Sequence, residues 1–109
     1  PLSAETDLAM TQVPYFLIFF AMGNDTDFGV PIQWRTTAKN VVAVGAAGDG
    51  FRDSQGNLTG GAAITSFTTK GPADDGRILP TIVANGVSLL SAIFETTSNG
   101  TFQYASLSG

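Results

Sequence analysis

Apolar residues in this sequence gather in short runs that are separated by glycine-rich and polar stretches. The longest run covers residues 15–22, eight apolar residues in a row, and it ends abruptly at Gly23-Asn24-Asp25. A short run with aromatic and β-branched residues is typical of a strand buried on both faces. Since Gly-Asn-Asp favours turns, the pattern predicts a buried strand that ends in a turn.

Shorter runs of the same kind predict the other strands. They cover residues 40–46, 63–67, 81–84, 87–92 and 101–104. Between residues 47 and 61 the composition changes to Gly, Asp, Asn and Ser, which indicates turns. A hairpin is therefore expected there, with residues 51–52 and 58–59 on its two arms.

A single helix is predicted, at the start of the chain. Ala4, Leu8 and Ala9 recur on one helical face, Ser3 is a candidate N-cap, and Pro14 ends the pattern. Parallel sheets normally carry helices on both faces, and one helix cannot cover so many strands. The pattern thus predicts an α/β chain that is only part of a larger sheet.

Composition and charge exclude several classes of function. The chain has 109 residues, a net charge of −4 and five scattered basic residues, whereas nucleic-acid binding needs a clustered positive face. It contains no cysteine and no histidine, so it cannot form a disulfide or a Ser-His-Asp triad from its own residues. No apolar run approaches the roughly 20 residues that cross a bilayer, and no signal-peptide pattern begins the chain.

Several motifs resemble the subtilases, the subtilisin-like serine proteases, in their order and spacing. They are Gly23-Asn24 after an apolar strand, Ala-Val-Gly-Ala at 43–46, Ser-Phe-Thr-Thr-Lys-Gly-Pro at 66–72, Asp-Gly-Arg-Ile-Leu-Pro-Thr-Ile-Val-Ala-Asn-Gly-Val at 75–87, Leu-Ser-Ala at 90–92, and the run 104–109. The resemblance covers about residues 15–109. It implies an α/β fragment of a three-layer, doubly wound, mainly parallel sheet, with a hairpin insertion and one clear helix.

The resemblance also implies a site and a reaction. Asn24 is expected to donate its side-chain amide to the oxyanion of a tetrahedral intermediate, which needs a rigid, neutral donor. Gly23 and Met22 are expected to lie at the pocket that binds the substrate, although Met22 can equally be core. The parent is then a secreted or extracytoplasmic bacterial endopeptidase acting on protein or peptide substrates.

The resemblance places the catalytic triad outside these residues. Residues 1–109 correspond to part of a catalytic domain, between the histidine and the nucleophile, which is expected two residues after Gly109. Ser108 is therefore not the catalytic serine. The chain alone is expected to be inactive, and the apolar surfaces that truncation exposes are expected to make it self-associate.

Three positions depart from the pattern of the family. Thr81 stands where an aspartate is common, Asn85 where proline usually precedes glycine, and Lys70 where arginine or serine is usual. A second interpretation is a degenerate subtilase-like module that binds or supports without catalysis even in the parent. The flanking sequence distinguishes the two: Thr-Ser directly after Gly109 and upstream Asp and His motifs would support the enzyme. An unrelated small α/β domain is a third, and a structure in which the runs at 15–22 and 40–46 are not parallel neighbours would favour it.

No cofactor is expected, although calcium is possible in the parent because oxygen-rich loops suit this cation. The candidate ligands are Asp49, Asp53, Asn57, Asp74 and Asp75, and turns use the same residue types. The spacing of an EF-hand is absent, so no metal ligand is assigned. Three sequences at residues 24–26, 57–59 and 99–101 match the acceptor pattern for N-glycosylation, which is common and has no meaning in a bacterial chain.

Overall fold

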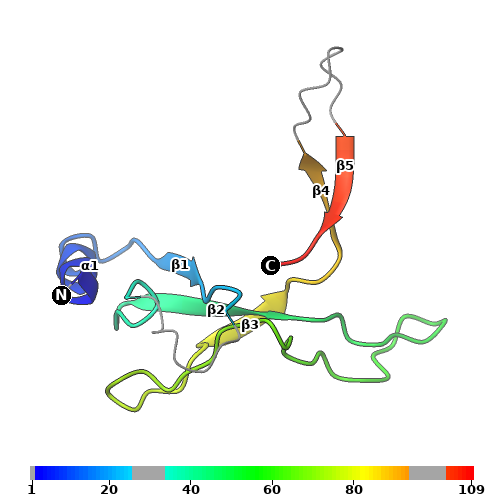
Figure 1. Ribbon diagram of the computed structural model, residues 1–109, viewed down its shortest axis with the longest axis horizontal. Coiled ribbons are helices and arrows are strands. Elements are labelled where there is room, and N and C mark those ends of the chain that lie inside the picture. The colour runs from blue at the N-terminus through cyan, green and yellow to red at the C-terminus, as the bar shows by residue number, and fades with distance from the viewer. Residues whose placement is uncertain (1, 26–33, 94–102) are drawn as a thin grey trace.

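A computed structural model describes residues 2–25, 34–93 and 103–109 of the chain. Within these ranges it contains α1 (Leu2–Gln12), β1 (Ile18–Ala21), β2 (Val41–Ala47), β3 (Ile82–Asn85), β4 (Leu89–Ile93) and β5 (Gln103–Leu107). Strands β1, β2 and β3 form a parallel sheet in this order, and β4 pairs with β5 as an antiparallel hairpin (Figure 1). The predicted α/β class with a mainly parallel sheet is confirmed.

Strand β2 is the centre of the parallel sheet. Ile18 of β1 pairs with Val41, and Ile82 of β3 pairs with Val44. The residues of β2 are buried or half-buried throughout, whereas those of β3 are all exposed. The predicted runs at 15–22 and 40–46 are therefore parallel neighbours, so the arrangement that would favour the third interpretation is not the one observed.

The first strand is shorter and more exposed than the sequence predicts. It begins at Ile18, and its residues alternate between half-buried and exposed. Tyr15, Phe16 and Phe19 are 102%, 62% and 59% exposed. The prediction of a strand buried on both faces is wrong for this chain, because β1 lies at the edge of the three-stranded sheet and the described residues pack against only one of its faces.

The helix is present, but its buried face is not the predicted one. Since α1 begins at Leu2, Ser3 lies inside the helix and is not its N-cap. Leu8 is 61% exposed, and Met10 is the buried residue of the helix. The Oδ1 atom of Asp7 accepts hydrogen bonds from the backbone N–H groups of residues 39 and 40, both at 2.7 Å. A polar contact therefore joins α1 to the start of β2.

One predicted strand does not form. In the segment 63–67, Ile64 makes a single antiparallel bridge to Ala47, and bends follow at residues 66–68. The Thr65 hydroxyl lies 2.8 Å from that of Thr68 and accepts a hydrogen bond from the Thr68 N–H. Threonine hydroxyls that bond locally in this way compete with strand pairing.

The strands predicted at 81–84 and 87–92 are confirmed as β3 and β4, with ends displaced by one or two residues. The strand predicted at 101–104 begins outside the described residues, and β5 covers 103–107. The hairpin predicted between residues 47 and 61 is also confirmed. Arg52 bridges Leu58, and the Thr59 N–H donates to the Phe51 carbonyl at 2.7 Å.

The tip of that hairpin is organised by Asp53. Its Oδ1 accepts from the N–H groups of Gln55 and Asn57, and its Oδ2 accepts from the Asn57 amide at 3.1 Å. These bonds stabilise the ionised carboxylate, so the pKa of Asp53 is lowered, with the Asn57 side chain as the largest cause. The stabilisation is present above the pKa of the unfolded chain and is lost as the pH falls through the lower, folded value.

We therefore expect Asn57→Ala to raise the pKa of Asp53 toward its ordinary value of 3.8. Carboxyl carbon chemical shifts followed by NMR from pH 2 to pH 6 measure this directly, in about the range where aspartate titrates. Asp75 is the internal control, because Arg77 lowers its pKa and the substitution leaves Arg77 in place. An unchanged Asp53 titration in the variant contradicts the assigned cause.

A small hydrophobic core packs the parallel sheet against the loop before β3. Met22, Ala43, Ala73 and Leu79 form one buried cluster. The loop is also held by Arg77, which pairs with Asp75 at 2.8 Å and donates to the carbonyl of Thr37. This core packs the residue that follows β1, Met22, against Ala43 of β2 and against the loop.

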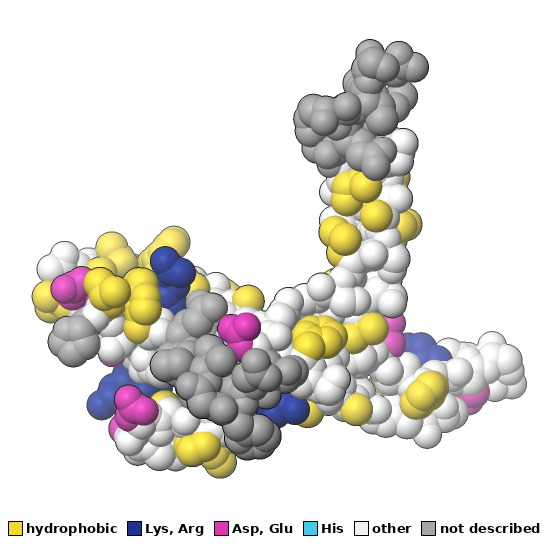
Figure 2. Space-filling model, in the orientation of Figure 1, with side chains coloured by type: hydrophobic (Ala, Val, Ile, Leu, Met, Phe, Trp, Pro, Cys, Tyr) yellow, Lys and Arg dark blue, Asp and Glu magenta, His cyan; other side chains and the backbone are white. Residues whose placement is uncertain are grey.

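Many apolar side chains lie on the surface of the described chain. They gather around α1 and β1 and along the β4–β5 hairpin (Figure 2), where Leu90 and Tyr104 are among the most exposed. The self-association expected from the sequence stays a prediction. Among the described residues, no helix has the length and apolar character that crossing a membrane requires.

Candidate functional site

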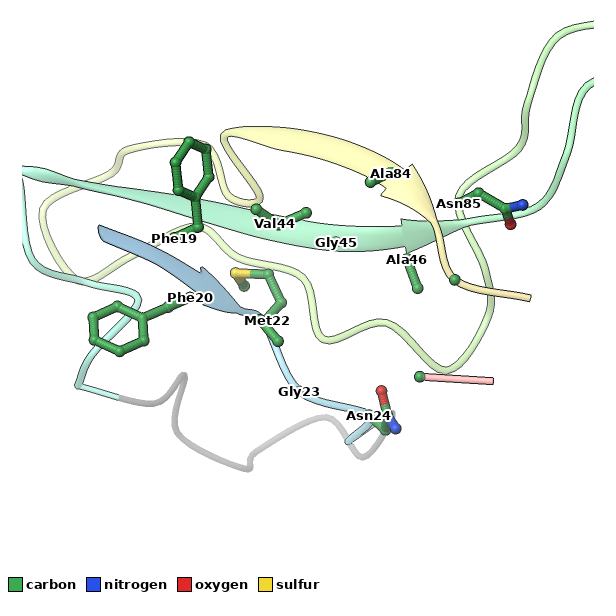
Figure 3. A pocket seen from close by; sticks show the side chains of 13 residues that line it. Phe19, Phe20, Met22, Gly23, Asn24, Val44, Gly45, Ala46, Ala84 and Asn85 are labelled. Atoms are coloured by element: carbon green, nitrogen blue, oxygen red, sulfur yellow. The ribbon is translucent and has the colours of Figure 1, made fainter. Parts of the chain in front are cut away.

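The carboxyl ends of β1, β2 and β3 meet at one edge of the sheet, because the three strands are parallel. Ligands of open α/β sheets gather at this edge, and a cavity of about 230 Å³ lies here (Figure 3). It is lined by Phe19, Phe20, Ala21, Met22, Gly23, Asn24, Val44, Gly45, Ala46, Ala84, Asn85, Gly86 and Gly109. Cavities for drug-sized ligands measure roughly 300–1,000 Å³, so this one suits a single amino-acid side chain.

Asn24 lies at this cavity because it follows the end of β1 by three residues. The Met22 N–H donates to the Val44 carbonyl at 2.9 Å, which continues the pairing beyond Ala21. Gly23 then adopts a φ of 95°, a value that residues with a Cβ rarely take. The chain turns at this glycine, so that Met22 is buried and the next side chain, Asn24, is exposed.

The other two strand ends supply the walls. The Thr68 hydroxyl accepts from the Ala46 N–H at 2.9 Å and donates to the Ala46 carbonyl at 3.0 Å, which fixes the end of β2. Beyond β3, the Gly86 N–H donates to the Ala47 carbonyl at 2.9 Å. The cavity is thus bounded by backbone that hydrogen bonds hold in place.

The segment after β5 returns to the same edge. The Gly109 N–H donates to the Gly86 carbonyl at 3.0 Å. A Cβ on Gly86 would lie 2.6 Å from both the Ala46 Cβ and the Gly109 oxygen, so only glycine permits this approach. A Cβ on Gly109 would lie 3.4 Å from the Asn24 Nδ2, which places the two residues side by side.

The cavity is lined by apolar groups, backbone and two amides, and none of its lining side chains is ionisable. The Asn85 amide is engaged in local structure: it donates to Asp49 at 2.7 Å and accepts from the Val87 N–H at 3.1 Å. The Asn24 amide is a neutral N–H donor on an exposed turn. Such a donor can stabilise negative charge that develops on a carbonyl oxygen in the cavity.

The three candidate site residues predicted from the sequence lie at the same cavity. Asn24, Gly23 and Met22 all line the cavity, and Met22 is at the same time part of the buried core. Sequence reasoning missed Asn85 and Gly86, which lie at the same edge. The carboxyl end of the predicted strand at 81–84 was the signal that could have located them.

Of the candidate calcium ligands, Asp53 and Asn57 are bonded to each other, whereas Asp49 bonds Asn85 and Asp75 bonds Arg77. Within the described ranges, no three Asp, Glu, His or Cys side chains gather at a point that could hold a metal ion. No metal ligand is therefore assigned among these residues.

The chain was compared with known protein families and with curated protein sequences. The sequence pattern of the subtilase family matches residues 3–109. No curated protein sequence matches the chain.

Proposed function

Because this chain belongs to the subtilase family, we propose that it forms part of a serine endopeptidase in which Asn24 donates to the oxyanion. The observation that supports this most directly is the position of the Asn24 amide. It lies at the carboxyl edge of the parallel sheet, at an uncharged cavity and beside Gly109. A secreted or extracytoplasmic location is part of the same proposal.

The proposed reaction is acyl transfer at a peptide carbonyl. When a serine oxygen attacks the carbonyl carbon, the carbonyl oxygen gains negative charge that the substrate lacks in its ground state. The Asn24 Nδ2–H donates to this oxygen, beside a cavity whose side-chain walls are mostly apolar. The donor therefore lowers the barrier more than it strengthens substrate binding.

The cavity beside the amide is proposed to hold a substrate side chain. Its walls include Val44, Ala46 and Ala84, and it has no charged lining residue. An apolar side chain of moderate size fits both the volume and the lining. We propose that the enzyme prefers such a residue next to the bond that it cleaves.

The nucleophile and its base are proposed to lie in sequence outside residues 1–109. The 109 residues include no histidine, so the usual base of the triad is absent from them. The 109-residue chain is therefore expected to give no turnover of a peptide substrate, whereas the complete polypeptide is expected to be active.

A fluorescent fluorophosphonate, which modifies activated serines covalently, tests this proposal. We expect it to label the complete polypeptide and to abolish peptide hydrolysis, while the 109-residue chain stays unlabelled. Heat-denatured complete polypeptide is the control for non-specific reaction. An unlabelled, inactive complete polypeptide contradicts the proposal and supports a non-catalytic module instead.

The three residues that depart from the family pattern fit the local structure. Thr81 accepts from the Ala43 N–H at 3.3 Å and donates its own N–H to the Ala43 carbonyl at 2.8 Å. Asn85 accepts from the Val87 N–H and so stabilises the turn that follows β3. Lys70 is exposed to solvent. These substitutions leave the edge of the sheet intact.

A further inference from the structure

Thr69 lies behind the turn that carries Asn24, although the two are distant in sequence. Its side chain is buried, at 8% exposure. The Thr69 N–H donates to the Gly23 carbonyl at 3.1 Å. Thr69 is therefore hydrogen-bonded to the residue that directly precedes Asn24.

The same threonine also holds the residue just after Asn24. The Asp25 N–H donates to the Thr69 Oγ1 at 3.1 Å, and that hydroxyl donates its proton to the Asp25 carbonyl at 3.1 Å. Three hydrogen bonds from one residue thus hold the backbone on both sides of Asn24. A threonine hydroxyl can do this because it is donor and acceptor at once.

The turn needs such support from elsewhere in the chain. Asn24 is exposed, so packing of its own side chain does not fix it. Gly23 precedes it, and glycine has more backbone freedom than any other residue. The position of the Asn24 amide therefore depends on contacts to the flanking backbone.

Thr69 is itself attached to the central strand. The preceding residue, Thr68, is 3% exposed and bonds both backbone groups of Ala46 at the end of β2. Segment 68–69 thus joins the end of β2 to the turn after β1. The Asn24 turn is positioned relative to the sheet through this segment.

We propose that Thr69 is a positioning residue for the oxyanion donor, a role that rests on the function proposed above. A donor lowers the barrier only if it is held where the oxyanion forms, and a displacement of about 1 Å can reduce a rate by about 10²-fold. The Thr69 hydroxyl holds Asn24 in place through Asp25. It does not touch the substrate.

Steady-state kinetics of the complete peptidase test this role. Thr69→Val removes the hydroxyl at nearly constant volume, and we expect kcat to fall by about ten- to a hundredfold with KM changed less than threefold, because the donor acts mainly in the transition state. Thr69→Ser keeps the hydroxyl and is expected to retain most of kcat. Equal losses in both variants overturn the proposal.

A double variant separates positioning from general destabilisation. If Thr69 acts through Asn24, adding Thr69→Val to Asn24→Ala lowers kcat by less than twofold further, since the donor is already absent. Thr81→Val is the control, because it removes a threonine hydroxyl that bonds the Ala43 N–H and does not bond the turn or segment 68–69. If this control acts independently of Asn24, the fold-loss of kcat in its double variant with Asn24→Ala is expected to equal the product of the two single fold-losses. If the fold-loss of kcat in the double variant of Thr69→Val and Asn24→Ala equals the product of the two single fold-losses, the inference is overturned.

The outcomes also separate this inference from the proposed function. If Asn24→Ala leaves kcat unchanged, the proposed function fails; if it lowers kcat but Thr69→Val does not, only the role of Thr69 fails. Amide hydrogen exchange on the unmodified 109-residue chain needs no variant. The Asp25 N–H is expected to exchange at least tenfold more slowly than an unstructured amide, and exchange at the unprotected rate contradicts the contact.

Discussion

Replacing Asn24 by alanine in the complete peptidase is expected to lower kcat by about 10²- to 10³-fold, a magnitude taken from the corresponding amide of subtilisin and not calculated for this chain. The substitution removes an N–H donor from the place where the oxyanion forms and leaves the ground-state contacts of the substrate largely intact. KM should therefore change little. Initial rates over a range of peptide concentrations measure both constants.

Asn85 provides a control of the same residue type in the same cavity. Its amide is already bonded to Asp49 and to the Val87 N–H, so Asn85→Ala is expected to affect local stability more than kcat. The pair distinguishes a specific donor from a general effect of removing an amide at this edge. Equal losses of kcat in the two variants, or no loss from Asn24→Ala, contradict the assigned role.

Replacing Met22 by alanine is expected to destabilise the chain by about 2–5 kcal/mol, the usual range when a large buried side chain is removed and leaves a cavity. Met22 is 1% exposed and packs with Ala43, Ala73 and Leu79. Native domains are stable by only about 5–15 kcal/mol, so this loss is a large share of the total. Urea unfolding of the 109-residue chain, followed by circular dichroism, measures it.

Two further variants test the cause of that loss. Met22→Leu nearly conserves volume and is expected to cost less than about 1.5 kcal/mol. Leu90 is 76% exposed, so Leu90→Ala is expected to change stability by less than about 0.5 kcal/mol. If Met22→Ala is no worse than Leu90→Ala, Met22 is not a core residue and its role is confined to the cavity.

The turn and the central strand could be located from local sequence. The β-branched run at 40–46 has the composition of a buried strand, and β2 covers Val41–Ala47. Gly23 was recognisable as a turn residue, and its φ of 95° requires that residue type. These features depend on the dihedral preferences of a few neighbouring residues, which the sequence carries directly.

Burial could not be read from the same pattern. The run at 15–22 is uniformly apolar, yet Phe16 and Phe19 are exposed because β1 is an edge strand. In α1, Met10 is buried and Leu8 is exposed, against the predicted face. An apolar residue is buried only where another part of the chain supplies a surface, and a local pattern holds no information on that partner.

The sequence and the tertiary structure each determined a different part of the turn at Asn24. The sequence by itself determined that a glycine and a neutral amide follow an apolar strand, because turn chemistry is local. Only the tertiary structure decided that Thr69 bonds the residues on either side of this amide and that Gly109 lies beside it. Hydrogen bonds between residues so far apart in the chain form only after the strands have paired, so no local pattern can specify them.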